Sequence, residues 1–210
     1  MTRVILCDDH ALIRRGIRDT LAEQPDMDVV GEAGDYGELR ALMRQQSGDV
    51  LVLDINMPGR SGLDVLHALK EEGNPIKVLI VSMYPEDQYA LRALRGGAYG
   101  YVNKGGDPAQ IVAAVRIVAQ GRKYITAEMA QMLVENLTTP ASDAAAHDKL
   151  SDREMQTLTM IASGKRLSDI AEELTLSPKT VSVYRARVLE KLGLANNSEL
   201  TVYAIRNGLV

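Results

Sequence analysis

The sequence predicts an α/β domain built on a five-stranded parallel, doubly wound sheet, followed by a second domain that is all α-helical. In the first 120 residues, five short apolar runs alternate with five segments in which apolar residues recur at helical spacing. Strands that alternate with helices form a parallel sheet, because each parallel pair needs a crossover connection. Beyond this region only helical patterns occur, which indicates a separate domain of another class.

The predicted strands are short apolar runs at positions 3–8, 27–33, 49–54, 77–83 and 99–103. Runs such as VILC, VLVLD and VLIVS lack clean alternation, which is typical of strands covered on both faces. Helices are expected at 11–23, 36–46, 62–72, 86–96 and 107–119. His10 is expected to lie at the start of the helix at 11–23, which is a more common place for such a histidine than a ligand site. The fifth begins with a capping acid, Asp107, and with Pro108 at the first helical position.

The rest of the chain is expected to form helices joined by one linker. A helix is expected at 127–137, and the small, polar stretch TTPASDAAAHD at 138–148 is typical of a linker. Ser151 and Glu154 belong to a capping-box pattern, SDRE, which starts a helix that reaches about residue 163. Further helices follow near 168–174, 178–191 and 198–206. We therefore divide the chain into a domain at 1–121, a helix and linker at 122–149, and a domain at 150–210.

Composition limits the class of protein and its compartment. Of the 210 residues 46% are hydrophobic, and the net charge of −4 gives no overall preference for nucleic acid. No apolar run approaches the roughly 20 residues that span a bilayer, and the N-terminus lacks a secretory signal pattern. The single cysteine, Cys7, excludes an internal disulfide and fits a reducing compartment. We expect a cytoplasmic protein without a membrane partner, with Cys7 in the core.

Polar groups follow four of the predicted strands. The first ends in Asp8 and Asp9, the third in Asp54, the fourth in Ser82, and Lys104 follows the fifth. In open α/β sheets, ligands bind beyond the carboxyl ends of the strands, so these side chains should converge on one site. Each alone has a plainer explanation: a helix cap, a turn aspartate, a small serine or a solvated lysine. Their agreement on one sheet edge favours a site.

This group of side chains is suited to a cation and to phosphoryl transfer. Three neighbouring carboxylates repel one another unless a cation lies between them. Mg²⁺ suits such a site, because it binds one or two carboxylates and keeps waters and phosphate oxygens as its other ligands. A carboxylate can also attack phosphorus, and Asp54, alone on its strand, is the candidate nucleophile. Asp9 would bind the metal, Asp8 would help directly or through water, and Ser82 and Lys104 would bind phosphoryl oxygens.

Residues 1–121 resemble the receiver domain of two-component response regulators. The resemblance lies in the acids at 8–9, the run VLVLDINMPGRSG at 50–62, the serine at 82 and the segment GGAYGYVNK at 96–104. It implies a flavodoxin-like fold in which Asp54 accepts a phosphoryl group. It also implies a Mg²⁺ site formed by Asp8, Asp9, Asp54 and the main-chain carbonyl of Asn56. None of these positions departs from the family pattern.

The same resemblance implies how a signal leaves the site. It makes Ser82 the switch hydroxyl, Tyr101 the switch aromatic and Lys104 the phosphate-binding lysine. Phosphorylation of Asp54 adds charge and acceptor oxygens. Ser82 would then move to meet one oxygen, Tyr101 would swing into the vacated space, and the face of the fourth helix, fifth strand and fifth helix would repack.

In the second domain, the segment at 166–194 has the pattern of a helix, a short turn and a longer helix. Ser177 and Pro178 give the longer helix a firm start. Its apolar stripe consists of Val181, Tyr184, Val188 and Leu192. The span 178–191 carries four basic residues against one acidic residue, a local charge of +3. A recognition helix needs cations for phosphates and small or apolar side chains for base edges, although a basic amphipathic helix can also be an ordinary solvated face.

Residues 150–210 resemble a LuxR-type helix-turn-helix, in the segments LSDRE, IAEEL, LSPKTV, KLGL and EL-x-x-YA. The resemblance gives two sets of DNA contacts: toward the groove Ser182, Val183 and Ala186, and toward phosphates Lys179, Arg185, Arg187 and Lys191. Three features depart from the family pattern. The segment RLS at 166–168 replaces a cap-like Ser-Asn-Lys, and Asn197 replaces a common arginine. Ala186 offers no base hydrogen bond, which leaves Val183 to contact thymine methyl groups.

The whole chain resembles the NarL/FixJ family of response regulators. This implies a transcription regulator with a sensor histidine kinase as phosphodonor, Mg²⁺ as cofactor and double-stranded DNA as target, and RNA polymerase is a candidate partner. Such helices bind as two-fold dimers across half-sites about one helical turn apart, or a multiple of it, so we expect a homodimer when the protein is phosphorylated or bound to DNA. The apolar seam Leu200, Tyr203 and Ala204 of the last helix could form its interface or belong to the domain core.

Three other functions share parts of this pattern. An aspartate-nucleophile phosphohydrolase also has an aspartate at a strand tip, but it needs a second acid two residues later, where this chain has Asn56. A dinucleotide-binding enzyme needs a glycine-rich loop after the first strand, where this chain has DDHALIRRG. A regulator that uses its receiver only for dimerisation, without phosphate, stays open. We expect a protein that is not an enzyme.

Overall fold

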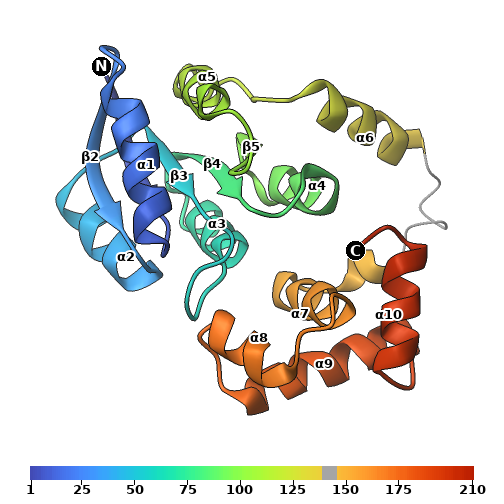
Figure 1. Ribbon diagram of the computed structural model, residues 1–210. Helices are drawn as coiled ribbons and strands as arrows, with labels where there is room; N and C mark the ends of the chain where they lie inside the picture. The colour runs from blue at the N-terminus through green and yellow to red at the C-terminus, as the bar shows by residue number, and fades with distance from the viewer. Residues whose placement is uncertain (139–145) are drawn as a thin grey trace. The chain divides into compact units, whose positions relative to one another are not determined.

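The computed structural model describes residues 1–138 and 146–210, which divide into two compact units, Met1–Asn136 and Leu137–Val210 (Figure 1). The first unit contains the sheet, and the second is helical throughout its described part. Most of the predicted linker, positions 139–145, lies outside the described residues. The predicted domain limits at 121 and 149 stay predictions, since the division between the two units falls inside a helix.

The first unit is a five-stranded parallel sheet in the order β2-β1-β3-β4-β5. Its strands are β1 (Thr2–Cys7), β2 (Met27–Ala33), β3 (Val50–Leu53), β4 (Lys77–Ser82) and β5 (Gly100–Asn103). The helices between and after them are α1 (Ala11–Ala22), α2 (Tyr36–Gln45), α3 (Gly62–Glu71), α4 (Glu86–Gly96) and α5 (Pro108–Ala119). The predicted doubly wound sheet is therefore confirmed, with no element end displaced by more than one residue.

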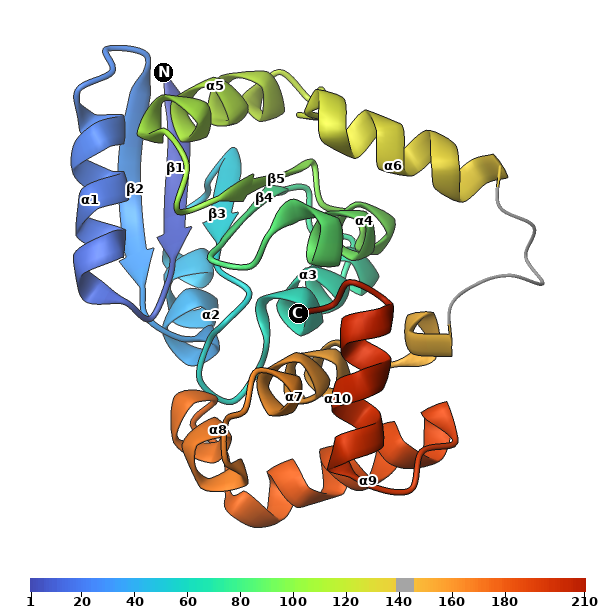
Figure 2. The ribbon, with the colours of Figure 1, turned by 45° about the vertical axis from the view of Figure 1, so that its right-hand side comes forward.

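Helices cover both faces of this sheet, which is why its strands are apolar throughout (Figure 2). Helices α1 and α5 lie on one face, where Leu6 and Val52 share a core with Ile17, Leu21 and Ile111. Helices α2, α3 and α4 lie on the other. Every residue of β3 is buried, so the strand that leads to Asp54 is fixed from both sides.

The loop after β3 is fixed by a close approach of α3. Ser61 caps α3 by accepting a hydrogen bond from the Asp64 N–H at 3.1 Å, and the Asp64 carboxylate accepts from the Ser61 N–H at 3.2 Å. At Gly62, the first residue of α3, an added Cβ would lie 1.9 Å from the Asp54 carbonyl oxygen. Only glycine therefore allows α3 to start this close to Asp54.

A further helix, α6 (Ala127–Thr138), is fastened to the edge of the sheet and to α4. The Tyr124 N–H donates to the Tyr99 carbonyl at 2.7 Å, beside β5. The Thr126 hydroxyl donates to Oε2 of Glu86 at 2.9 Å and accepts from the Met129 N–H at 3.2 Å, so one side chain both caps α6 and ties it to the first residue of α4.

The second unit contains η2 (Ala146–Lys149), a short 3₁₀ helix, followed by α7 (Asp152–Ala162), α8 (Leu167–Glu173), α9 (Pro178–Leu192) and α10 (Asn197–Arg206). The capping box at Ser151 and the cap at Ser177 are confirmed. Residues 146–148 were expected in the linker; they are helical, with His147 Nδ1 3.0 Å from the Tyr203 hydroxyl, a long-range contact that local pattern does not encode. Within the described ranges, no helix is long and apolar enough to cross a membrane.

Candidate functional site

The carboxyl ends of four neighbouring strands bring the predicted site residues together. Asp8 follows β1, Asp54 follows β3, Ser82 ends β4 and Lys104 comes directly after β5. The Asp54 N–H donates to the Cys7 carbonyl at 2.9 Å, and the Lys104 N–H donates to the Ser82 carbonyl at 2.8 Å. These main-chain bonds extend the sheet past the strand ends, so they fix where each side chain emerges.

Lys104 lies between two of the carboxylates. Its Nζ is 2.7 Å from Oδ2 of Asp8 and 2.7 Å from Oδ2 of Asp54. The Lys104 and Asp54 side chains are each only 2% exposed, so water screens this attraction little. One ammonium between two carboxylates leaves net negative charge in a buried place.

Burial and the neighbouring charges together set the pKa of Asp54. Burial raises the pKa of Asp54 from 3.8 to about 6, the attraction of Lys104 opposes this rise, and repulsion from Asp8 adds to it. Burial is the largest of these effects. The site therefore holds a carboxylate whose negative charge is only partly balanced, and an added cation would stabilise it.

His10 and Asp9 form the outer part of the same site. His10 is the N-cap residue of α1, as expected, and its N–H donates to Oδ1 of Asp8 at 2.9 Å. Its ring Nδ1 lies 2.7 Å from Oδ1 of Asp9 and 4.0 Å from Oδ2 of Asp54. Sequence reasoning did not expect the imidazole here, because the rotation of a side chain at a helix start is not visible in a sequence pattern.

The donor set fits a divalent ion. Asp8, Asp9, His10 and Asp54 each offer a ligand atom, and these atoms all lie within 4.8 Å of one another. Oδ1 of Asp54 is buried and makes no well-formed hydrogen bond with any described residue, so it has a free coordination position. Carboxylate oxygens are the ligands that Mg²⁺ prefers. The main-chain carbonyl of Asn56 stays a predicted ligand.

Ser82 and Tyr101 are linked through the loop that follows β4. The Tyr101 ring is fully buried and its hydroxyl donates to the Tyr84 carbonyl at 2.7 Å, which Asn103 also contacts through Nδ2 at 3.0 Å. The Tyr84 N–H donates to Oγ of Ser82 at 3.3 Å. The Tyr84 ring stacks on Tyr89, with 4.7 Å between the ring centroids. Tyr101 is therefore a core side chain and not a surface one.

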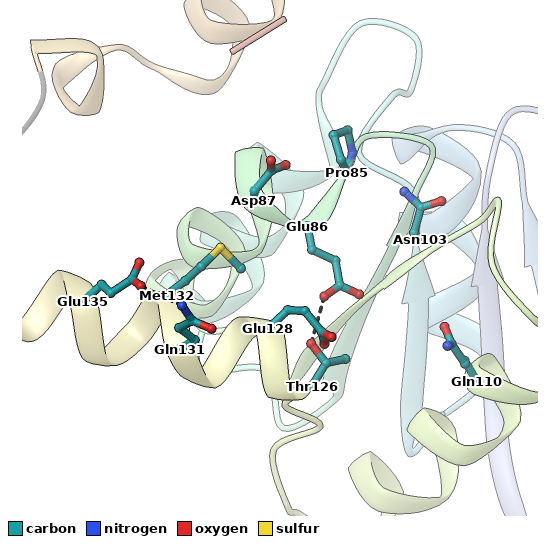
Figure 3. A pocket seen from close by; sticks show the side chains of 10 residues that line it. All are labelled: Pro85, Glu86, Asp87, Asn103, Gln110, Thr126, Glu128, Gln131, Met132 and Glu135. Atoms are coloured by element: carbon teal, nitrogen blue, oxygen red, sulfur yellow. Dashed lines mark hydrogen bonds between the residues drawn. The ribbon is translucent and has the colours of Figure 1, made fainter. Parts of the chain in front are cut away.

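A cavity of about 640 Å³ lies beside this loop, between the start of α4, the end of β5 and α6 (Figure 3). Four carboxylates line it, those of Glu86, Asp87, Glu128 and Glu135. Figure 3 shows the hydrogen bond from Thr126 to Glu86 at its edge. Sequence reasoning missed this cavity, because it depends on where α6 packs.

In the second unit, α9 has the two faces that the sequence predicted. Val181 and Val188 are fully buried. The residues expected to face a DNA groove, Ser182, Val183 and Ala186, are exposed, as are Lys179 and Arg187. The exposed face is therefore free to meet a ligand, and the DNA contacts assigned to it stay predictions.

Two of the predicted phosphate contacts have protein partners. Nε of Arg185 donates to Oδ1 of Asn197 at 2.5 Å, so the asparagine at this departure from the family pattern orients an arginine. Nζ of Lys191 lies 2.6 Å from Oε2 of Glu154 on α7. Burial would raise the pKa of Glu154, but hydrogen bonds from Lys191 and from Ser151 outweigh it and hold that pKa below its usual value. The ion pair competes with a DNA contact by Lys191.

Comparison with known proteins identifies the family. The response regulator receiver domain matches residues 4–116, and the luxR family of bacterial regulatory proteins matches residues 148–204. Over 210 residues the chain is 40% identical to the response regulator GacA of Pseudomonas protegens. The alignment covers 100% of this chain and 98% of GacA. The chain belongs to the NarL/FixJ-type response regulators.

This response regulator is also 36% identical over 209 residues to the response regulator UvrY of Escherichia coli, with 100% of this chain and 96% of that protein covered. Among solved structures it is similar to RcsB of Salmonella enterica serovar Typhimurium bound to the promoter rprA in the presence of the phosphomimetic BeF3⁻. That match has a TM-score of 0.65 and 26% identity, and covers 96% of this chain and 97% of RcsB. The resemblance to a two-component response regulator with a receiver and a LuxR-type DNA-binding domain is confirmed.

Proposed function

We propose that a sensor histidine kinase phosphorylates Asp54, and that this modification controls dimerisation and sequence-specific DNA binding to regulate transcription. The observation that carries the proposal is the placement of Asp54. It is a buried carboxylate at a strand end, within 2.7 Å of the Lys104 ammonium and next to the acids that follow β1. A structural carboxylate would be fully paired in such a place, whereas Oδ1 of Asp54 has no well-formed hydrogen bond among the described residues.

In the proposed reaction, an oxygen of Asp54 attacks the phosphorus of a phosphohistidine. The new P–O bond forms as the P–N bond breaks, and the imidazole nitrogen keeps the electron pair and takes a proton from solvent. Lys104 binds a phosphoryl oxygen, since its ammonium already contacts Asp54. Mg²⁺, when bound by Asp8, Asp9 and Asp54, would supply positive charge for the phosphoryl oxygens.

The signal would leave the site through Ser82. Its Oγ now accepts the Tyr84 N–H, so a turn toward a phosphoryl oxygen breaks this bond and releases the Tyr84 main chain. Tyr101 and Asn103 both donate to the Tyr84 carbonyl, so they follow the same displacement. The face made by α4, β5 and α5 would therefore repack after phosphorylation.

The second unit would bind double-stranded DNA through α9. The exposed Lys179 and Arg187 would contact phosphates, and Ser182, Val183 and Ala186 would face bases in the major groove. The RcsB relative bound to promoter DNA with a phosphomimetic supports this coupling of modification and DNA binding. We further propose that the active form is a homodimer, that RNA polymerase is a candidate partner and that the protein is not an enzyme.

Labelling with radioactive acetyl phosphate and Mg²⁺ tests the phosphoacceptor. Wild type and Asp28→Asn, which alters an exposed carboxylate on β2, should take up label, and Asp54→Ala should take up none. Undiminished labelling of Asp54→Ala would refute the assignment. Selection of bound sequences from a random DNA pool, with and without acetyl phosphate, then tests the coupling: the same recovery in both conditions would support a phosphate-independent regulator.

Steady hydrolysis of phosphate esters would instead support the alternative that the protein is a phosphohydrolase. The same preparation should therefore release no more phosphate from such esters than the Asp54→Ala variant does.

A further inference from the structure

We propose that His10 supplies a nitrogen ligand to the divalent ion of the acidic site, so that this site prefers a first-row transition ion such as Mn²⁺ to Mg²⁺. The inference rests on the metal site of the proposed function and deepens it. The ligands that the family resemblance implies are all oxygen atoms, from Asp8, Asp9, Asp54 and Asn56. An imidazole among them would change which ion the site selects.

The ring of His10 lies close to all three carboxylates. Nδ1 of His10 lies 2.7 Å from Oδ1 of Asp9, 3.6 Å from Oδ1 of Asp8 and 4.0 Å from Oδ2 of Asp54. Around an octahedral ion with ligands at 2.0–2.1 Å, neighbouring ligand atoms are about 3 Å apart and opposite ones about 4 Å apart. The spacing of the four groups therefore matches one coordination sphere after small side-chain rotations.

Lys104 leaves the side of the site next to His10 open. Lys104 contacts Oδ2 of Asp8 and Oδ2 of Asp54, whereas His10 lies nearest to the Oδ1 atoms of Asp8 and Asp9. A cation bound beside the two Oδ1 atoms would thus meet the imidazole and not the ammonium. Asp54 can offer its Oδ1 to the same ion, since this oxygen is buried and has no well-formed hydrogen bond in the described part of the chain, and an oxygen of Asp54 lies within 4.8 Å of the other ligand atoms.

The His10 backbone is fixed, while its ring has room to turn. The His10 N–H donates to Oδ1 of Asp8 at 2.9 Å and its carbonyl accepts the Arg14 N–H at 2.9 Å, so the Cα cannot move far from the acids. The side chain is 51% exposed, which leaves room for the ring to adjust. A bound ion would replace the contact between Nδ1 and Oδ1 of Asp9 by contacts of both atoms with the ion, which needs the unprotonated Nδ1.

The chemistry of the ligands gives the selectivity. Mg²⁺ demands oxygen ligands and dehydrates reluctantly. Imidazole suits transition ions, and the affinity of a mixed nitrogen and oxygen site rises along the first row from Mn²⁺ onward. A site with three carboxylates accepts both kinds of ion, and one imidazole shifts the preference toward the transition ion.

Electron spin-echo spectroscopy of bound Mn²⁺ tests the proposal on the full chain. Wild type should show the nitrogen coupling of a directly bound imidazole, and His10→Ala should lose it. The affinity for Mn²⁺, measured from free Mn²⁺ by its paramagnetic resonance signal, should fall about tenfold in His10→Ala, while the affinity for Mg²⁺ in competition changes little. The matched control is His67→Ala, which removes an exposed imidazole from α3 and should keep both the coupling and the affinity.

Asp54→Ala locates the ion, since this variant should lose the Mn²⁺ site altogether. Absence of nitrogen coupling in wild type, or its persistence in His10→Ala, would overturn the inference; so would an equal loss of Mn²⁺ and Mg²⁺ affinity. Labelling of Asp54 in Mg²⁺ is scored separately. If Asp54 is labelled but no nitrogen coupling appears, only the role of His10 is refuted. If the coupling appears but Asp54 takes up no label, only its assignment as phosphoacceptor is refuted.

Discussion

Replacing Asp54 by asparagine should make the metal-free receiver more stable. The rise of the Asp54 pKa from 3.8 to about 6 corresponds to about 3 kcal/mol, at about 1.36 kcal/mol for each pKa unit. Because this pKa is raised in the folded protein, the native state binds more protons than the unfolded state between these two values. Stability therefore falls as pH rises through this window, and the full cost is present above pH 6. Asparagine has the same shape as aspartate and carries no charge, so it removes the cost.

The gain from Asp54→Asn should depend on pH in a defined way. It should be about 3 kcal/mol at pH 7.5, about 1 kcal/mol at pH 4.5, and absent well below pH 3.8. Hydrogen exchange of the β3 amides in the presence of a chelator reports the free energy of opening in this part of the first unit. The control Asp28→Asn should change that free energy by less than about 0.5 kcal/mol, because its carboxylate is exposed.

Two results would refute the reasoning. An Asp54→Asn variant that is no more stable than wild type at pH 7.5 would mean that burial does not destabilise the carboxylate. A gain that stays constant between pH 7.5 and 4.5 would assign the effect to packing and not to charge. Added Mg²⁺ should stabilise wild type more than the variant, because the ion binds the folded site and not the unfolded chain.

Three further predictions concern the second unit and the lifetime of the phosphoryl group. Lys191→Ala should lower the free energy of unfolding by about 2 kcal/mol, because Glu154 loses its ion pair. Urea unfolding measures this change, with Lys179→Ala as the control. An unchanged free energy of unfolding would mean that the ion pair does not hold Lys191, which could then contact DNA. Arg187→Ala should weaken binding to many DNA sequences alike and lower the slope of log affinity against log salt concentration by about 1, measured by fluorescence anisotropy. An unchanged slope would mean that another residue makes the phosphate contact. Tyr84→Ala should speed the loss of radiolabel if the large side chain two residues past Ser82 hinders water that approaches the acyl phosphate in line; faster loss from wild type would contradict this.

The ends of the strands that lead to the site could be predicted because each of these apolar runs in the sequence stops at a polar residue. The acids after β1 and β3 follow apolar runs that only a sheet covered on both faces explains, and the strand order then brings Asp8, Asp54 and Lys104 to one edge. Cys7 was expected in the core and is buried there, where burial, with repulsion from Asp8, raises its pKa to about 12. The cap at Asp107 was also expected, and its carboxylate accepts the Ala109 N–H at 2.9 Å.

Contacts between distant side chains could not be predicted. The pairs Lys191 with Glu154 and Arg185 with Asn197 join residues that a helical wheel treats separately. The position of the His10 ring depends on rotations about its two side-chain bonds. These features depend on how packed elements meet, which the spacing of apolar residues does not specify. The proposed DNA contacts were carried over from the family motif, which does not show the partners on α7 and α10.

The hydroxyl of Thr126 determines how α6 can respond when the start of α4 shifts. It holds two bonds of different kinds, one to Glu86 in α4 and one to the Met129 N–H within its own helix. A shift of α4 breaks the first and leaves the second. Helix α6 would then keep its capped first turn and its attachment beside β5 through Tyr124, while its contact with α4 changes.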